Sequence, residues 1–278
     1  SNPGYPRSPT ASYMKNKVIQ AEQSEESRIS FLTKHLNVWC DKASVWVPHK
    51  VWTQNQTPID IEKLKGKPCY GGLDLATIWD LAALVLIFPD DSQGFRRYDI
   101  LVRCWIPREN MMKRVQKDKV PYFDFAKDGL ITTTDGNSID YDYIEKQILQ
   151  DCTDFDVKMI AYDRYNSTHL IQKLTESECT EMIPFNQTTT WFNAPIKELE
   201  LLAHQGRLNH ANNKVLNWHC SNVVLIKDSN DNVKFDKAKS IEKIDSMVSL
   251  AMALGIAIKD IEEKEEESIY NTRGLLEL

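Results

Sequence analysis

The sequence predicts an α/β domain with a mixed central β-sheet and helices on both faces. Three observations predict it: three apolar strand-like segments come first, strands and helices alternate after them, and one long helical segment is apolar almost all round. The chain has 278 residues, of which 42% are hydrophobic and 27% are charged, so it can build a sizeable globular core.

The first three strands are expected to form an antiparallel meander. They are residues 69–76, 81–88 and 98–106, each rich in apolar side chains. Residues 77–80 make a turn between the first two strands, and the sequence Pro-Asp-Asp-Ser-Gln-Gly at 89–94 has strong turn chemistry. Connections this short favour antiparallel neighbours in a sheet.

After the meander, strands and helices alternate, which places helices on both faces of a sheet. The ribonuclease H-like fold has this order of elements. A hairpin is expected near the end, because residues 223–227 and 232–236 flank the turn-forming sequence Asp-Ser-Asn-Asp at 228–231. The other expected strands are 130–134, 157–162 and 182–185. One helix is expected after Pro107, and four more are expected at 141–152, 167–176, 194–204 and 241–258.

The chain is expected to divide into three parts. Residues 1–60 form a partly helical extension, with a helical pattern at 22–36. Residues 61–260 form the compact domain. Residues 261–278 form an acidic tail, because a run of charged side chains begins at Glu262.

Composition excludes several classes of protein. No apolar run reaches the roughly 18 residues that a membrane span needs, and the first residues lack the apolar core of a signal peptide. Six cysteines without CxxC spacing indicate a reduced, intracellular protein rather than a zinc site or a disulfide scaffold. The net charge of −6 argues weakly against nucleic-acid binding, although a local basic patch is enough for a nuclease that holds metals on carboxylates.

Three aspartates stand where a carboxylate is costly. Asp74 lies inside an apolar strand, Asp163 ends another, and Asp245 lies in the helix that is apolar almost all round. A buried carboxylate must be paired, hydrogen-bonded or bound to a metal. A loop hydrogen bond or a helix cap explains each one singly. Together they favour a shared metal site, because the three elements that carry them can converge in such a fold.

Two divalent cations on such carboxylates suit phosphodiester hydrolysis. One ion lowers the pKa of a bound water to make the nucleophile, and the other stabilises the leaving 3′ oxygen. Oxygen ligands favour Mg²⁺ or Mn²⁺ over zinc. Asp80 is a fourth candidate ligand at the turn after the first strand, and an ordinary role in stabilising that turn is equally consistent with its position.

Two further motifs concern phosphate groups. Residues 66–71 imitate the start of a phosphate-binding loop, but Gly72 stands where the essential lysine belongs, so this chain is not expected to hydrolyse ATP. Lys237, Lys239 and Lys243 come shortly before the third aspartate and are candidates for holding a DNA backbone against the metals. A solvated basic face is the alternative explanation of these lysines.

Three segments around the aspartates share the pattern of one known family. They are GGLDLATIWDLAAL at 71–84, AYDRYN at 161–166 and KIDSMVSLAMAL at 243–254. These segments resemble the nuclease motifs of the large terminase subunits of tailed bacteriophages. The segment FLTKHLNVW at 31–39 also resembles the connection between the motor and nuclease halves of that family, so the resemblance covers about residues 30–258.

The resemblance implies a ribonuclease H-like nuclease domain that cuts concatemeric viral DNA during genome packaging. It implies that Asp74, Asp163 and Asp245 are catalytic metal ligands for two Mg²⁺ or Mn²⁺ ions, with Asp80 as a nearby acidic helper. The implied partners are double-stranded DNA, the terminase small subunit, the portal or procapsid, and an N-terminal ATPase motor domain that is expected to be missing here. The implied location is the cytoplasm of the bacterial host.

Two other interpretations stay open at this point. Another ribonuclease H-like nuclease, such as a transposase or a resolvase, uses a similar acidic triad, although the motif at 243–254 and the lead-in favour the terminase. A catalytically silent module that docks on the portal would keep the aspartates only as structural relics. Such a module would gain no stability from Mn²⁺.

Overall fold

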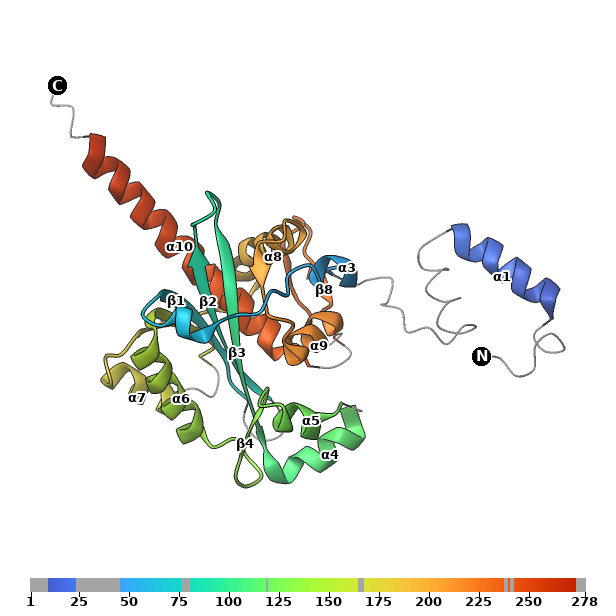
Figure 1. Cartoon of the computed structure of the whole chain (residues 1–278), viewed down its shortest axis with the longest axis horizontal. Coiled ribbons are helices and arrows are strands. Elements are labelled where there is room, and N and C mark those ends of the chain that lie inside the picture. Colours follow the sequence, from blue (N-terminus) through green and yellow to red (C-terminus); the bar gives the residue numbers. More distant parts are fainter. Residues whose placement is uncertain are drawn as a thin grey trace.

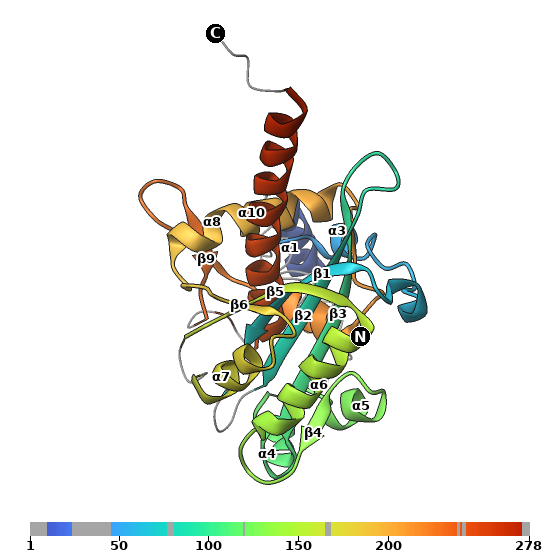
Figure 2. The ribbon, with the colours of Figure 1, turned by 90° about the vertical axis from the view of Figure 1, so that its left-hand side faces the viewer.

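A mixed β-sheet lies between two layers of helices in the computed structural model, which confirms the expected α/β architecture (Figure 1, Figure 2). The structure describes residues 10–23, 46–76, 81–118, 120–164, 168–237, 240 and 243–273. Asp80 and Lys239, two of the expected site residues, lie outside these ranges.

The strands lie close to the positions expected from the sequence. They are β1 (Pro68–Asp74), β2 (Ala82–Asp90), β3 (Arg97–Pro107), β4 (Thr132–Thr134), β5 (Asp156–Tyr162), β6 (Glu181–Pro184), β7 (Leu208–Asn209), β8 (Leu225–Lys227) and β9 (Val233–Phe235). The first three form the expected antiparallel meander. β5 is parallel to both β1 and β6, and the sheet order is β4-β3-β2-β1-β5-β6, with β7 paired to β3. The expected hairpin, β8 with β9, is a separate two-stranded sheet.

The helices also follow the expected order, with additions. They are α1 (Ala11–Gln23), α3 (His49–Trp52), the short 3-10 helix Ile61–Leu64, α4 (Arg108–Asp118), α5 (Tyr122–Lys127), α6 (Tyr141–Asp154), α7 (Thr168–Glu176), α8 (Thr189–His204), α9 (Lys214–Asn222) and α10 (Asp245–Arg273). Sequence reasoning missed α9, which Asn213 caps by accepting two backbone N–H groups at 3.0 Å. α10 begins at Asp245 rather than at residue 241. The helix expected at 22–36 lies almost entirely outside the described residues.

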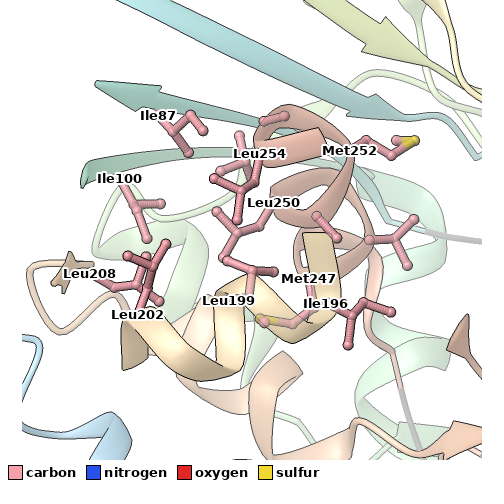
Figure 3. Packing of buried hydrophobic residues seen from close by; sticks show 14 of the residues in the cluster. Ile87, Ile100, Ile196, Leu199, Leu202, Leu208, Met247, Leu250, Met252 and Leu254 are labelled. Atoms are coloured by element: carbon pink, nitrogen blue, oxygen red, sulfur yellow. The ribbon is translucent and has the colours of Figure 1, made fainter. Parts of the chain in front are cut away.

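The sheet has an apolar core on each face. On one face, Val85, Ile87 and Ile100 pack with α8 and α10 (Figure 3). On the other, Leu84 and Leu86 pack with α6 and α7. Successive side chains of a strand point to opposite faces of a sheet, so a strand covered on both sides must be apolar throughout. The uninterrupted apolar run in β2 is the consequence.

The first turns of α10 are buried on all sides, as their apolar sequence predicts. Met247, Val248, Leu250 and Ala251 are 0% exposed. The helix packs against β1 and β2 on one side and against α8 on the other (Figure 3). Its backbone then continues away from the body of the domain to Arg273 (Figure 2). Among the described residues, no helix, α10 included, is both long and apolar enough to span a membrane.

Gly72 lets α10 approach β1 backbone to backbone. A Cβ atom added at Gly72 would lie 1.9 Å from the carbonyl oxygen of Ser249 and 2.8 Å from the amide nitrogen of Ala253. The Ser249 hydroxyl donates to the carbonyl of Ala83 at 3.0 Å, which ties the same turn of α10 to β2. This contact fixes where the start of α10 lies over the sheet.

The segment from Trp46 to Trp52 packs against this body. Trp46 and Trp52 are buried in the same core as α8 and α10. Trp52 stacks on His210, with ring centroids 4.5 Å apart, and its indole N–H donates to Asn217 Oδ1 at 2.8 Å. The division of the chain near residues 60 and 260 stays a prediction; the described body begins at Trp46, and α10 runs across residue 260 without a break.

Candidate functional site

Asp74 and Asp163 lie side by side at one end of the sheet. Asp74 is the last residue of β1, and Asp163 follows the last residue of β5. These strands are parallel, and the pairing of Leu73 with Tyr162 places the two aspartates next in register. Because side chains alternate along a strand, Asp74 shares the face of Gly72, which is the face that α10 covers.

α10 brings the third aspartate to the same end of the sheet. Two contacts show that the helix runs antiparallel to β1. The Tyr70 hydroxyl donates to Asp260 at 2.5 Å, and Gly72, which comes later in the strand, lies against Ser249, which comes earlier in the helix. The two residues from Gly72 to Asp74 advance about 6 Å along the strand, and the four residues from Ser249 back to Asp245 advance about the same distance along the helix. The last residue of β1 therefore comes level with Asp245, the first residue of α10.

Lys237 pairs with the first of the three aspartates. Its ammonium nitrogen lies 2.8 Å from Asp74 Oδ2 and 3.2 Å from Oδ1. Burial acts to lower the pKa of this lysine, but the charges of Asp74, Asp245 and Asp163 outweigh burial and raise it above its usual value. The charges of all three aspartates that the sequence singled out thus act on one ammonium group, which contacts Asp74 directly.

Gln187 also belongs to this site, although sequence reasoning missed it. Its Nε2 donates to Asp74 Oδ1 at 3.3 Å. The residue follows β6, the parallel neighbour of β5, so it lies at the same carboxyl-terminal edge as Asp163. A polar side chain three residues after the end of a short strand was the signal that could have identified it. The carboxylate of Asp74, a residue only 5% exposed, is therefore held by one charged and one neutral donor.

His219 of α9 holds the start of α10. Its Nδ1 accepts from the backbone N–H of Ser246 at 3.1 Å and lies 2.5 Å from the Ser246 hydroxyl. The first amides of a helix have no partner inside the helix, so this contact caps α10. Burial, together with the charge of Lys243, lowers the pKa of His219 to about 3, which keeps the imidazole neutral and able to accept. The cap fixes the backbone next to Asp245.

The neutral His219 leads us to expect an acid-sensitive fold. The unfolded chain takes up a proton on this residue below the ordinary pKa of 6.5, whereas the folded chain does so only near 3, so the free energy of unfolding falls as the pH drops through that window. Urea unfolding at about pH 7.5 and about pH 5.5 measures the fall, which should be smaller in a His219→Gln variant. His210, whose pKa burial also lowers, contributes equally to both proteins. Equal falls in the two proteins would contradict this assignment.

The donor set suits a hard divalent cation. The three aspartates offer only oxygen ligands, which Mg²⁺ and Mn²⁺ prefer, and a cationic ammonium already lies among them. Within the described ranges, no three or more His, Cys, Asp or Glu side chains are close enough together to hold a metal ion as they stand. Among the described residues, the three aspartates therefore do not form a closed set of ligands while Lys237 pairs with Asp74. Asp80 lies outside the described residues.

The lysines expected to contact DNA fall in three different situations. Lys237 lies at the aspartates, and its side chain is 45% exposed. Lys243 lies two residues before α10, where its carbonyl accepts from the Asn222 side chain at 3.0 Å. Lys239 lies outside the described residues. A DNA contact by these lysines stays a prediction.

The ribonuclease H-like sheet carries aspartates at two adjacent strand ends and at the start of α10, the positions that a nuclease is expected to use. A sequence model of the family described as the terminase large subunit, endonuclease domain, matches residues 1–261. The chain belongs to this family and is therefore a nuclease domain, a hydrolase.

Known relatives agree with this assignment. The chain is 29% identical over 237 residues to the large subunit of the terminase of Enterobacteria phage HK97, covering 84% of this chain and 46% of that protein. It is 29% identical over 245 residues to protein YmfN of Escherichia coli strain K12, covering 85% and 53%. The crystal structure of the HK97 bacteriophage large terminase superimposes with a TM-score of 0.69 at 27% identity, covering 88% of this chain and 50% of that one. The chain thus spans about half the length of these relatives.

Proposed function

We propose that this domain is a metal-dependent endodeoxyribonuclease that cuts concatemeric viral DNA during genome packaging. One observation carries the proposal: Asp74 at the end of β1 pairs with Lys237, and the charges of Asp245 on α10 and of Asp163 after β5 act on the same ammonium group. Clustered carboxylates repel one another and are costly to bury unless a cation lies among them. Membership of the terminase nuclease family supports this proposal and disfavours a transposase or a resolvase.

In this proposal, Asp74, Asp163 and Asp245 are the catalytic metal ligands. Two divalent cations, Mg²⁺ or Mn²⁺, supply a water of lowered pKa and stabilise the leaving 3′ oxygen when bound. The protein's own task is to hold the carboxylates in place. Gln187 orients one oxygen of Asp74 through its hydrogen bond. His219 fixes the helix start that carries Asp245.

The DNA backbone is proposed to lie against lysines that come shortly before α10 in the sequence. Lys237, which contacts Asp74, is proposed to hold a phosphate near the metals together with Lys239 and Lys243, which come shortly before Asp245 in the sequence. A local patch of this kind is consistent with the overall charge of −6, because the aspartates themselves contribute to that acidity.

The remaining parts of the proposal concern the longer protein. Since the chain spans about half of its relatives, we propose that residues 1–60 connect it to an ATPase motor and that residues 261–278 form an acidic tail. The motor, the terminase small subunit and the portal or procapsid are the proposed partners, in the cytoplasm of the bacterial host. This chain itself is proposed to have no ATPase activity, because its segment at 66–71 does not lead into the lysine of a phosphate-binding loop.

Cleavage of supercoiled plasmid by the purified domain tests the proposed function. With Mn²⁺ or Mg²⁺, nicked and linear products should accumulate, and their ends should carry 5′ phosphate and 3′ hydroxyl groups, as expected when the 3′ oxygen leaves. EDTA should stop the reaction. Cleavage that persists in EDTA would contradict the metal-dependent mechanism.

A silent docking module is the second interpretation, and metal binding separates it from a nuclease that needs its motor to load DNA. Thermal unfolding of the domain with Mn²⁺ or with EDTA provides the comparison. A nuclease site binds Mn²⁺ in the folded state alone and gains stability from it. No cleavage combined with no stabilisation by Mn²⁺ would overturn the proposed nuclease.

A further inference from the structure

Both carboxylate oxygens of Asp74 are engaged by side chains of this chain. The Asp74 side chain is 7% exposed, and Lys237 Nζ contacts Oδ2 at 2.8 Å and Oδ1 at 3.2 Å. Gln187 adds a donor to Oδ1 at 3.3 Å. A divalent cation ligated by Asp74 needs the same lone pairs and brings two positive charges close to the ammonium. The lysine and a metal ion therefore compete for one carboxylate.

Lys237 is the partner that is free to move. Its side chain is 45% exposed, so the ammonium regains water when it turns outward. The residue follows β9, whose two-stranded sheet is separate from the main sheet. Asp74 is held in place, because its strand, β1, is hydrogen-bonded on one side to β2 and on the other to β5. When the ion pair breaks, the lysine therefore moves and the carboxylate stays in place.

We propose that Lys237 is a built-in counter-cation of Asp74 which a divalent ion displaces when it binds. The inference rests on the proposed metal-dependent function and adds a property to that site. The lysine stabilises the buried carboxylate and, by the same contact, keeps the affinity for metal below the value that the carboxylates alone would give.

Titration of the domain with Mn²⁺ alone, in a calorimeter, tests the competition in a Lys237→Met variant. Methionine keeps the length of the side chain but removes its charge. We expect Mn²⁺ to bind roughly fivefold to tenfold more tightly, because a half-exposed ion pair no longer has to be broken. The melting temperature in EDTA should be lower than that of the wild type, and the rise caused by Mn²⁺ should be larger.

Two variants serve as controls in the same titration. Lys234→Met removes an equal charge from β9, the strand just before Lys237, and should leave the Mn²⁺ affinity unchanged. Lys237→Arg keeps a cation at the site and should bind Mn²⁺ with an affinity closer to that of the wild type. If Lys234→Met raised the affinity as much as Lys237→Met, the effect would come from net charge, which would overturn the inference.

The outcomes distinguish this inference from the proposed function. If the wild type binds Mn²⁺ and Lys237→Met binds it equally or more weakly, the lysine and the metal do not compete, and the inference fails while the nuclease proposal stands. If neither protein binds Mn²⁺, both fail. An Asp74→Asn variant gives the reference for a lost metal ligand in the same titration.

Discussion

Replacing Asp245 with asparagine is expected to abolish DNA cleavage and leave the fold intact. The change removes one carboxylate from the cluster at the end of β1, where the family resemblance places a metal ligand, so the rate of plasmid nicking with Mn²⁺ should fall by at least about 100-fold. The free energy of unfolding in EDTA should be unchanged or higher, because fewer like charges meet at the site. Nicking rates and urea unfolding curves measure the two effects separately.

Asp260→Asn is the matched control for this experiment. Asp260 lies on the same helix, is 8% exposed, and accepts the hydroxyl of Tyr70 far from Asp245, so the chemical change is identical and only the place differs. An asparagine there still accepts this hydrogen bond. Nicking should stay close to the wild-type rate in Asp260→Asn. If Asp245→Asn cut DNA as fast as the wild type, Asp245 would not be a catalytic metal ligand.

Gly72→Ala is expected to have the largest effect on stability. The added Cβ would lie 1.9 Å from the carbonyl oxygen of Ser249 and 2.8 Å from the carbonyl carbon of the same residue. These are backbone atoms of α10, which cannot turn aside, so the helix must move away from β1 and open the core on that face of the sheet. We expect a loss of about 3 kcal/mol or more in the free energy of unfolding, measured with urea.

The neighbouring glycine provides the control. At Gly71 an added Cβ would lie 2.8 Å from Ile160 Cγ1 and 3.2 Å from Leu86 Cδ2, both side-chain atoms that can shift. Gly71→Ala should therefore cost only about 1 kcal/mol. Similar losses in Gly71→Ala and Gly72→Ala would mean that α10 does not rest on the backbone of β1 as described.

The elements that sequence reasoning predicted well are those that local pattern decides. The short connections in the sequence predicted the antiparallel meander, which the structure confirms, and the predicted strand before Asp163 is β5, which ends at Tyr162. The buried helix followed from its apolar residues, although its start at Asp245 was placed too early. That error has a physical cause, because the cap at this end comes from His219 in another helix.

The features that were missed depend on contacts between distant segments. Nothing in the sequence near Asp74 indicates that Gln187 and Lys237 donate to it, since these residues are brought there by β6 and by the chain after β9. Lys237 was expected to meet a phosphate; in the structure it pairs with a carboxylate instead. Its role on DNA stays a prediction, and so does the role of Asp80.

Diffraction from crystals of the domain soaked in Mn²⁺, with anomalous scattering recorded from the metal, tests the central claim most directly. We expect anomalous peaks between Asp74, Asp163 and Asp245, with the ammonium of Lys237 no longer in contact with Asp74. Crystals without a peak among these aspartates at saturating Mn²⁺, and with Lys237 still paired to Asp74, would contradict it.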